Sequence, residues 1–248
     1  MPRRPRNRPA PAGWTRAELA ALRPLRTPGR IQAFVDALAY RAEDDPGSPR
    51  RVLAERRANC YDGALFAAAA LRRIGHRPLL VDLQAVRDDD HVLAVFRERG
   101  RWGAVAKSNF AGLRFREPIF RDVRELAASY FEDYFNLRGE KTLRNYSVPF
   151  DLSRLDPLDW TFRDEHLREI AGRLDGSRHH RLLTPAMSVP TMPARSDRGS
   201  TRRRARTMAG VSSRWWREPS RRPAISRRCS SRKVQSRASS RERSNGTE

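Results

Sequence analysis

Three residue types in the middle of the chain occur in the order that thiol chemistry requires. Cys60 begins the alanine-rich run CYDGALFAAAALRR, His91 follows 31 residues later, and Asn109 lies beyond it. In such chemistry a thiol attacks a carbonyl carbon, an imidazole accepts the thiol proton, and a third side chain orients the imidazole ring. The pattern therefore favours cysteine-dependent acyl transfer or amide hydrolysis.

The run after Cys60 predicts a helix over about 60–73, because it is apolar at helical spacing and Gly75 follows it. A thiol at the start of a helix lies near unpaired amides and the positive end of the helix dipole, so we expect a lowered pKa for Cys60. Asp62 opposes this effect, since a nearby carboxylate disfavours the thiolate. Asp62 could instead cap amides of the first turn and direct its charge away from the sulfur, and Asn59 is a plausible N-cap.

Other segments predict the elements that surround Cys60. Helices are expected after Thr27-Pro28 and Ser48-Pro49, and later over about 121–136 and in RDEHLREIAGRL. Strands are expected in RPLLVDLQAV, HVLAVFR and WGAVAKS, with ERGR as a hairpin loop, and in KTLRNYSVPFDL. Helices that lead into an antiparallel sheet predict an α+β domain over about 27–183.

The stretches NCYDGALFAAAALRRIGHRPLLVDL and DDDHVLAVFRERGRWGAVAKSNF resemble the core of the transglutaminase-like superfamily, which is distantly akin to papain-type enzymes. That family places its cysteine at the start of a helix that ends in a Leu-x-x-x-Gly turn, here Leu71 to Gly75. A strand led by histidine, a hairpin and a strand near a tryptophan follow. Cys60, His91 and Trp102 match these features over about residues 52–110.

The resemblance implies roles for individual residues. Cys60 would be the nucleophile and His91 the base and then the acid. The family usually carries Asp about four residues after the Trp, where this chain has Ala106, so Asn109 or Ser108 would have to orient His91. Alternation along the strand places Ser108 on the face of Ala106, and Asn109 on the opposite face.

The substrate implied is a protein, a peptide or a small amide, and no cofactor or metal is required. Water as the second nucleophile gives hydrolysis, and an amine gives transamidation. A different interpretation is a binding module that keeps the fold without turnover, because the Asp is missing and free cysteines are among the most buried residue types.

Almost all of the net charge of +22 comes from the two ends of the chain, and residues 31–194 contribute only +2. Residues 1–30 carry eight Arg and one acid, and residues 195–248 carry 17 basic residues and four acids. We expect 1–26 to be disordered or weakly helical and 184–248 to be a disordered tail rich in Arg, Ser and Pro. Such a tail would bind nucleic acid nonspecifically through phosphates. A frameshifted translation would give a similar composition.

The low cysteine count is typical of a protein from a reducing compartment. Cys60 and Cys229 are the two cysteines, so no disulfide framework is expected. No apolar run approaches the roughly 18 residues that a membrane helix needs, and we expect a cytoplasmic protein that does not contact membranes. No group of Cys and His has zinc-ligand spacing, and RHHR at 178–181 is expected in an unstructured segment.

Overall fold

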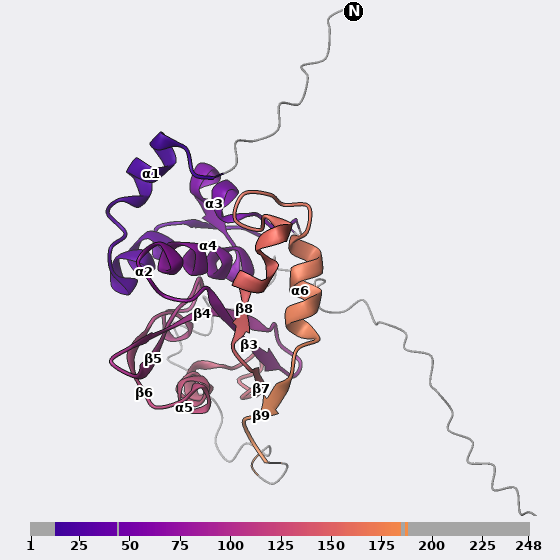
Figure 1. Ribbon diagram of the computed structural model, residues 1–248. Helices are drawn as coiled ribbons and strands as arrows, with labels where there is room; N and C mark the ends of the chain where they lie inside the picture. The colour runs from indigo at the N-terminus through magenta and orange to yellow at the C-terminus, as the bar shows by residue number, and fades with distance from the viewer. Residues whose placement is uncertain (1–12, 44, 185–186, 188–248) are drawn as a thin grey trace, which may run out of the picture. The chain divides into compact units, whose positions relative to one another are not determined.

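The computed structural model describes residues 13–43, 45–184 and 187, which all belong to a single structural unit (Figure 1). The first 12 residues lie outside the described residues, as does the predicted tail apart from Thr184 and Met187. Within the described part of the chain, no helix is both long enough and apolar enough to cross a membrane.

The central layer is an antiparallel sheet of seven strands in the order β6-β5-β4-β3-β7-β9, with β8 also paired to β3. A separate two-stranded parallel pair joins β1 to β2. Helices combined with a mostly antiparallel sheet confirm the predicted α+β class. The strands of the main sheet are β3 (Leu79–Ala85), β4 (His91–Glu98), β5 (Arg101–Val105), β6 (Arg116–Phe120), β7 (Leu143–Ser147), β8 (Phe150–Asp151) and β9 (His179–Arg181), and the pair is β1 (Ala39–Tyr40) and β2 (Arg57–Ala58).

One face of the sheet is covered by helices α2 (Pro28–Asp36), α4 (Cys60–Arg73) and α6 (Leu167–Asp175), with α3 (Pro49–Glu55) packed on α4 (Figure 1). Alternate residues of β4, among them Val92 and Ala94, pack in the same core cluster as α4. The apolar run of α4 is buried almost throughout, which explains why it consists of alanines: small side chains let the helix lie close to both the sheet and α2.

The opposite face carries a second core cluster, built on Leu93 and Val95 of β4 and covered by α5 (Val123–Ala128). The helix predicted over 121–136 is wrong in length. It ends at Ala128, and a short 3-10 turn, η2 (Phe131–Asp133), follows. The break buries Tyr130 and Tyr134 in one cluster, and both hydroxyls donate to backbone carbonyls, so tertiary contacts outweigh helical periodicity here.

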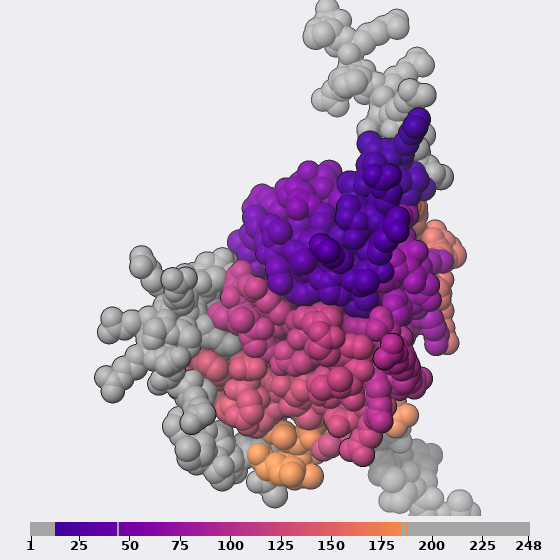
Figure 2. Space-filling model, turned by 90° about the vertical axis from the view of Figure 1, so that its left-hand side faces the viewer, coloured from indigo at the N-terminus to yellow at the C-terminus, as the bar shows by residue number. Residues whose placement is uncertain are grey.

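The packed region begins before the predicted boundary at residue 27. Helix α1 (Arg16–Leu22) starts with a capping box in which Thr15 and Glu18 satisfy each other's amides. Leu22 is buried in the core, and Trp14 packs edge-on against Phe162 with ring centroids 5.1 Å apart. On the face shown in Figure 2, the N-terminal residues (indigo) adjoin those of the middle of the chain (magenta to pink).

Helix starts and turns follow the sequence signals. Thr27 and Ser48 cap α2 and α3, each followed by proline, as predicted. Gly75, with φ of +96°, follows α4, and the His76 amide returns to the Leu71 carbonyl at 3.0 Å. The β4–β5 hairpin turns at Arg99 and Gly100, and both residues have positive φ. This is the backbone conformation of the two-residue turns that match the right-handed twist of the paired strands.

Candidate functional site

The thiol of Cys60 lies at the first residue of α4, as predicted. Its Sγ is 4.0 Å from the carbonyl oxygen of Asp90, the residue before β4 begins. Asn59 caps the helix, since its side-chain oxygen accepts the Asp62 amide at 2.9 Å. Among the described residues the amides of Cys60 and Tyr61 make no hydrogen bond. Cys60, a residue of intermediate burial, therefore begins a 14-residue helix whose first two amides have no hydrogen-bond partner in the described part of the chain.

The electrostatic environment of this thiol differs from the sequence-based expectation. Burial raises the pKa of Cys60 to about 12, and the carboxylates of Asp89, Asp62 and Asp82 act in the same direction. A hydrogen bond from the Val92 amide lowers the pKa but does not compensate. The predicted lowering of the Cys60 pKa at the helix start is therefore wrong, because burial and three carboxylates raise it.

His91 is the first residue of β4 and is buried. Its Nε2 lies 2.8 Å from the carbonyl oxygen of Leu113. Because a carbonyl can only accept, Nε2 carries the proton and Nδ1 keeps a free lone pair. Burial lowers the pKa of His91 to about 4, with Arg116 acting in the same direction and the Leu113 bond opposing it, so the ring is neutral at pH 7.

Cys60 begins the helix that packs on one face of the sheet, whereas alternation along β4 directs His91 to the other face. Val92 packs with α4, whereas Leu93 belongs to the opposite cluster. The His91 ring lies with that opposite cluster, edge-on to Tyr130 with centroids 6.5 Å apart and bonded to Leu113. In the described structure no hydrogen bond joins the thiol and the ring. The Cys60 thiol instead contacts backbone groups at the start of β4, the Asp90 carbonyl and the Val92 amide.

In the described structure, neither of the two residues predicted to orient His91 forms a hydrogen bond with its ring. The Ser108 hydroxyl is buried and accepts the Phe110 amide at 3.0 Å. Asn109 is exposed. The Leu113 carbonyl occupies the position that was assigned to these side chains. Sequence reasoning could not find it, because a backbone carbonyl has no residue-type signature.

A buried lysine borders the first turn of α4. Lys107 is 3% exposed, and its Nζ donates to the carbonyl of Leu38, just after α2. A Cβ placed on Gly63 would come within 2.4 Å of the Lys107 Cβ, so only glycine lets the strand end lie this close to the helix. Burial lowers the pKa of Lys107. This residue fixes the distance between the end of β5 and the turn that carries Cys60.

Sequence reasoning also missed a pair on the α4 face, formed by a buried Asp and a partly buried His. Asp82 of β3 is fully buried opposite Val92, and His179 of β9 lies 3.1 Å from its Oδ2. Asp82 Oδ1 has no hydrogen-bond partner among the described residues. The segment at 178–181 was expected to be unstructured, but the three residues of β9 pair with β7. These three residues are too few and too polar to indicate a strand from the sequence.

Comparison with protein-family models and with curated proteins finds no match to this chain. Within the residues that the structure describes, no three His, Cys, Asp or Glu side chains are grouped so that they could hold a metal ion.

Proposed function

We propose that this domain is a transglutaminase-like cysteine enzyme that transfers or hydrolyses acyl groups of amides or esters, with Cys60 as the nucleophile. The observation that carries the proposal is the placement of the Cys60 sulfur, beside two unused helix amides and at the carbonyl that precedes His91. A carbonyl oxygen that gains negative charge would find the amides of Cys60 and Tyr61 as donors without moving the backbone.

The state of His91 supports a role as base. With Nε2 committed to the Leu113 carbonyl, the remaining Nδ1 lone pair can accept a proton. Ala106, at the position where the resembled family carries Asp, lies in the core cluster that includes Leu113 and Tyr130. An alanine there cannot accept a hydrogen bond, and the Leu113 carbonyl takes over the orienting role that we first assigned to Ser108 or Asn109.

The proposed reaction begins when the Cys60 proton moves to His91 Nδ1 as the sulfur attacks the substrate carbonyl carbon. The new C–S bond places negative charge on the carbonyl oxygen. The imidazolium then donates its proton to the leaving nitrogen or oxygen, the bond to that atom breaks, and a thioester remains. Water releases an acid, or an amine releases a new amide. Direct proton transfer requires the thiol and the ring to lie within hydrogen-bond distance at the start of β4.

The proposal is tested by trapping the acyl-enzyme. p-Nitrophenyl acetate is mixed with the full chain in which Cys229→Ser removes the second thiol, and intact-mass and peptide mass spectrometry locate the acetyl group. We expect an acetyl adduct on Cys60 with release of nitrophenol, and neither event with Cys60→Ala. Nitrophenol release that is equal in wild type and Cys60→Ala would contradict the proposal.

A binding module without turnover is the second candidate. It is favoured by the two pKa values, since a thiol with a pKa of about 12 and an imidazole with a pKa of about 4 do not form a reactive ion pair at rest. For such a module the acetyl adduct would be absent, while Cys60→Ala would leave binding of a protein or peptide partner unchanged.

Nonspecific binding of nucleic acid by the tail is a third possibility, and its residues lie outside the described part of the chain. Deletion of 185–248 tests it: binding to a random duplex DNA that persists with the same dependence on salt would exclude the tail as the site. The cytoplasmic location also stays a prediction.

A further inference from the structure

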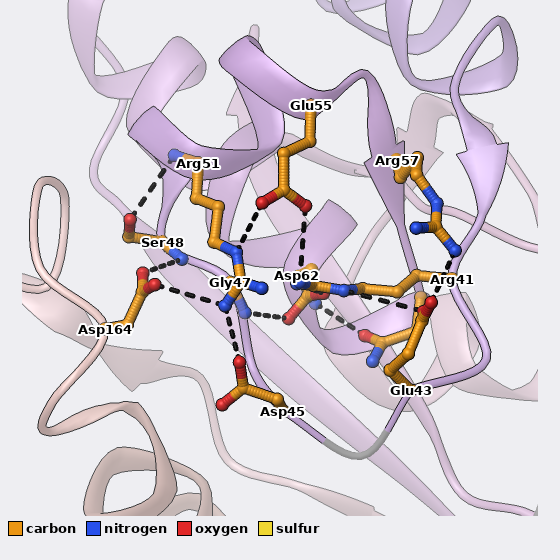
Figure 3. A network of polar contacts seen from close by, with 11 residues as sticks. Arg41, Glu43, Asp45, Gly47, Ser48, Arg51, Glu55, Arg57, Asp62 and Asp164 are labelled. Carbon is orange, nitrogen blue, oxygen red and sulfur yellow. Dashed lines mark hydrogen bonds and ion pairs between the residues drawn. The ribbon is translucent and has the colours of Figure 1, made fainter.

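The first turn of α4 contains a second charged group two residues from the thiol. Asp62 is fully buried and Arg41 is 3% exposed, with Arg41 Nη1 3.3 Å from Asp62 Oδ2. Figure 3 shows Arg41 extended alongside Asp62 beneath α3. Glu55 and Glu43 also approach Arg41, at 3.3 and 3.8 Å, but both are well exposed to solvent, which screens their charge. Asp62 is thus the buried counter-ion of Arg41.

Asp62 also fixes the backbone around it. Its Oδ1 accepts the Gly47 amide at 2.9 Å, which ties the segment after β1 to the helix (Figure 3). A Cβ on Gly47 would lie 2.5 Å from Arg41 Nη1, so glycine is what lets the guanidinium pass. Burial raises the pKa of Asp62 to about 6, and Arg41 and the Gly47 amide oppose the rise, so the carboxylate is ionised at neutral pH.

We propose that Arg41 is a positioning residue for the proposed nucleophile Cys60: by balancing the charge of Asp62, it keeps a buried negative charge in the first turn of α4 from acting unopposed on the thiol. The inference rests on the proposed function for the role of Cys60 as a nucleophile. The effect of Arg41 and Asp62 on the thiol does not depend on that role. It explains why a carboxylate that disfavours the thiolate lies two residues from Cys60. The carboxylate holds the turn together, and the guanidinium offsets its cost to the thiol.

The experiment is a charge cycle on Arg41 and Asp62, read by the rate at which iodoacetamide alkylates Cys60. The variants are Arg41→Gln, Asp62→Asn and the double variant, each in the full chain with Cys229→Ser. Rates are measured between about pH 7 and 10 by mass spectrometry, with circular dichroism to confirm folding. Arg51→Gln is the matched control, because Arg51 pairs with Asp45, Glu55 and Asp164 in the same network but makes no bond to Asp62 (Figure 3).

The two single variants should shift the rate in opposite directions. At about pH 9, where Asp62 is ionised, Arg41→Gln should alkylate about three- to tenfold more slowly than wild type, equivalent to about 0.5–1 unit in the thiol pKa. Asp62→Asn should alkylate faster by a similar factor. The double variant restores the balance of charge and should return to within about twofold of wild type, as should Arg51→Gln.

A purely structural role would give a different pattern. If both single variants slow alkylation, or if Arg41→Gln matches Arg51→Gln, the inference is overturned. Should Arg41→Gln fail to fold, a faster Asp62→Asn and a wild-type rate for the double variant still support it, and equal rates for these two contradict it. Alkylation uses no substrate, so a chain that forms no acetyl adduct but shows the opposite shifts would refute the proposed function alone.

Discussion

Two histidines on opposite faces of the sheet, His91 buried and His179 partly buried, have pKa shifts in opposite directions. His91, on the α5 face, bonds a neutral carbonyl, and burial lowers its pKa to about 4. His179, on the α4 face, bonds the carboxylate of Asp82, which raises its pKa despite the opposing effect of burial. Burial acts on both rings in the same direction, so the charge of the partner decides the state of each ring.

The two faces also differ in their buried carboxylates. Asp62 and Asp82 are both fully buried on that side, and each has a cationic partner. On the opposite face the His91 ring lies edge-on to Tyr130 and bonds the Leu113 carbonyl, and Arg116 is the charged group that acts on its pKa. Burial is the main cause that raises the pKa of the Cys60 thiol, and the carboxylates of Asp89, Asp62 and Asp82 raise it further, whereas burial lowers the pKa of the His91 imidazole.

Removing the ring of His179 should produce the largest loss of stability. His179→Ala leaves the Asp82 carboxylate buried without a counter-ion, and we expect a loss of about 3–5 kcal/mol in the free energy of unfolding at pH 7. His180→Ala, one residue along the same strand, is the control and should cost much less, because its ring only packs beside Tyr146. Urea unfolding measures both. Equal losses would mean that Asp82 does not depend on His179.

The same pair makes the stability depend on pH, because both of its pKa values are shifted by folding. The pKa of His179 and that of Asp82 are both raised in the folded protein, so the folded state holds their shared proton more tightly than the unfolded chain does. The stability that this gives is present at low pH and is lost as pH rises through the folded pKa of His179. The difference in stability between wild type and His179→Ala should therefore shrink as the pH is raised.

His91 should give the opposite dependence. Its pKa is about 4 in the folded protein against 6.5 in an ordinary environment, so the unfolded chain takes up the proton first on acidification. The stability from a neutral His91 is present above about pH 6.5 and is lost as pH falls toward 4, by about 3 kcal/mol. His91→Gln should lose less stability over this window than wild type in parallel urea titrations. If the free energies of unfolding of the two proteins changed with pH in parallel, the burial of a neutral His91 ring would be contradicted.

The smallest expected effects on stability come from replacing a glycine in α4, which begins with Cys60, and a glycine in α6, which precedes His179. Gly63→Ala should cost about 1–3 kcal/mol, because the new Cβ meets Lys107 at 2.4 Å. Gly172→Ala in α6 meets nothing within 4 Å at an exposed position and should raise stability by about 0.5–1 kcal/mol. Thermal unfolding of the two variants measures both, and a stabilising Gly63→Ala would show that the first turn of α4 is not tightly packed.

Features whose cause is local could be predicted from the sequence. Thr27 with Pro28, Ser48 with Pro49, and Cys60 with Gly75 mark helix ends through bonds made within a few residues. The hairpin after β4 is of the same kind. The position of Cys60 at a helix start and of His91 at a strand start followed from these signals, as did the α+β class.

Features whose cause is tertiary could not be predicted. Strand β6 contains Pro118 and alternates weakly, and β9 has three residues, so neither sequence indicates a strand. The partner of His91 is a backbone carbonyl, and that of Asp82 lies 97 residues away. The pKa of Cys60 was expected in the wrong direction because local reasoning counted helix amides, whereas burial and Asp89 and Asp82 act through the fold.

The most direct test of the account is the rate at which Cys60 is acylated in a single turnover with and without His91. With p-nitrophenyl acetate at pH 7 and enzyme in excess, wild type should form the thioester about 10²- to 10⁴-fold faster than His91→Gln, whose amide can still donate to Leu113 but cannot accept the thiol proton. Equal rates in the two proteins would show that the imidazole never takes the proton of Cys60 and would contradict the account.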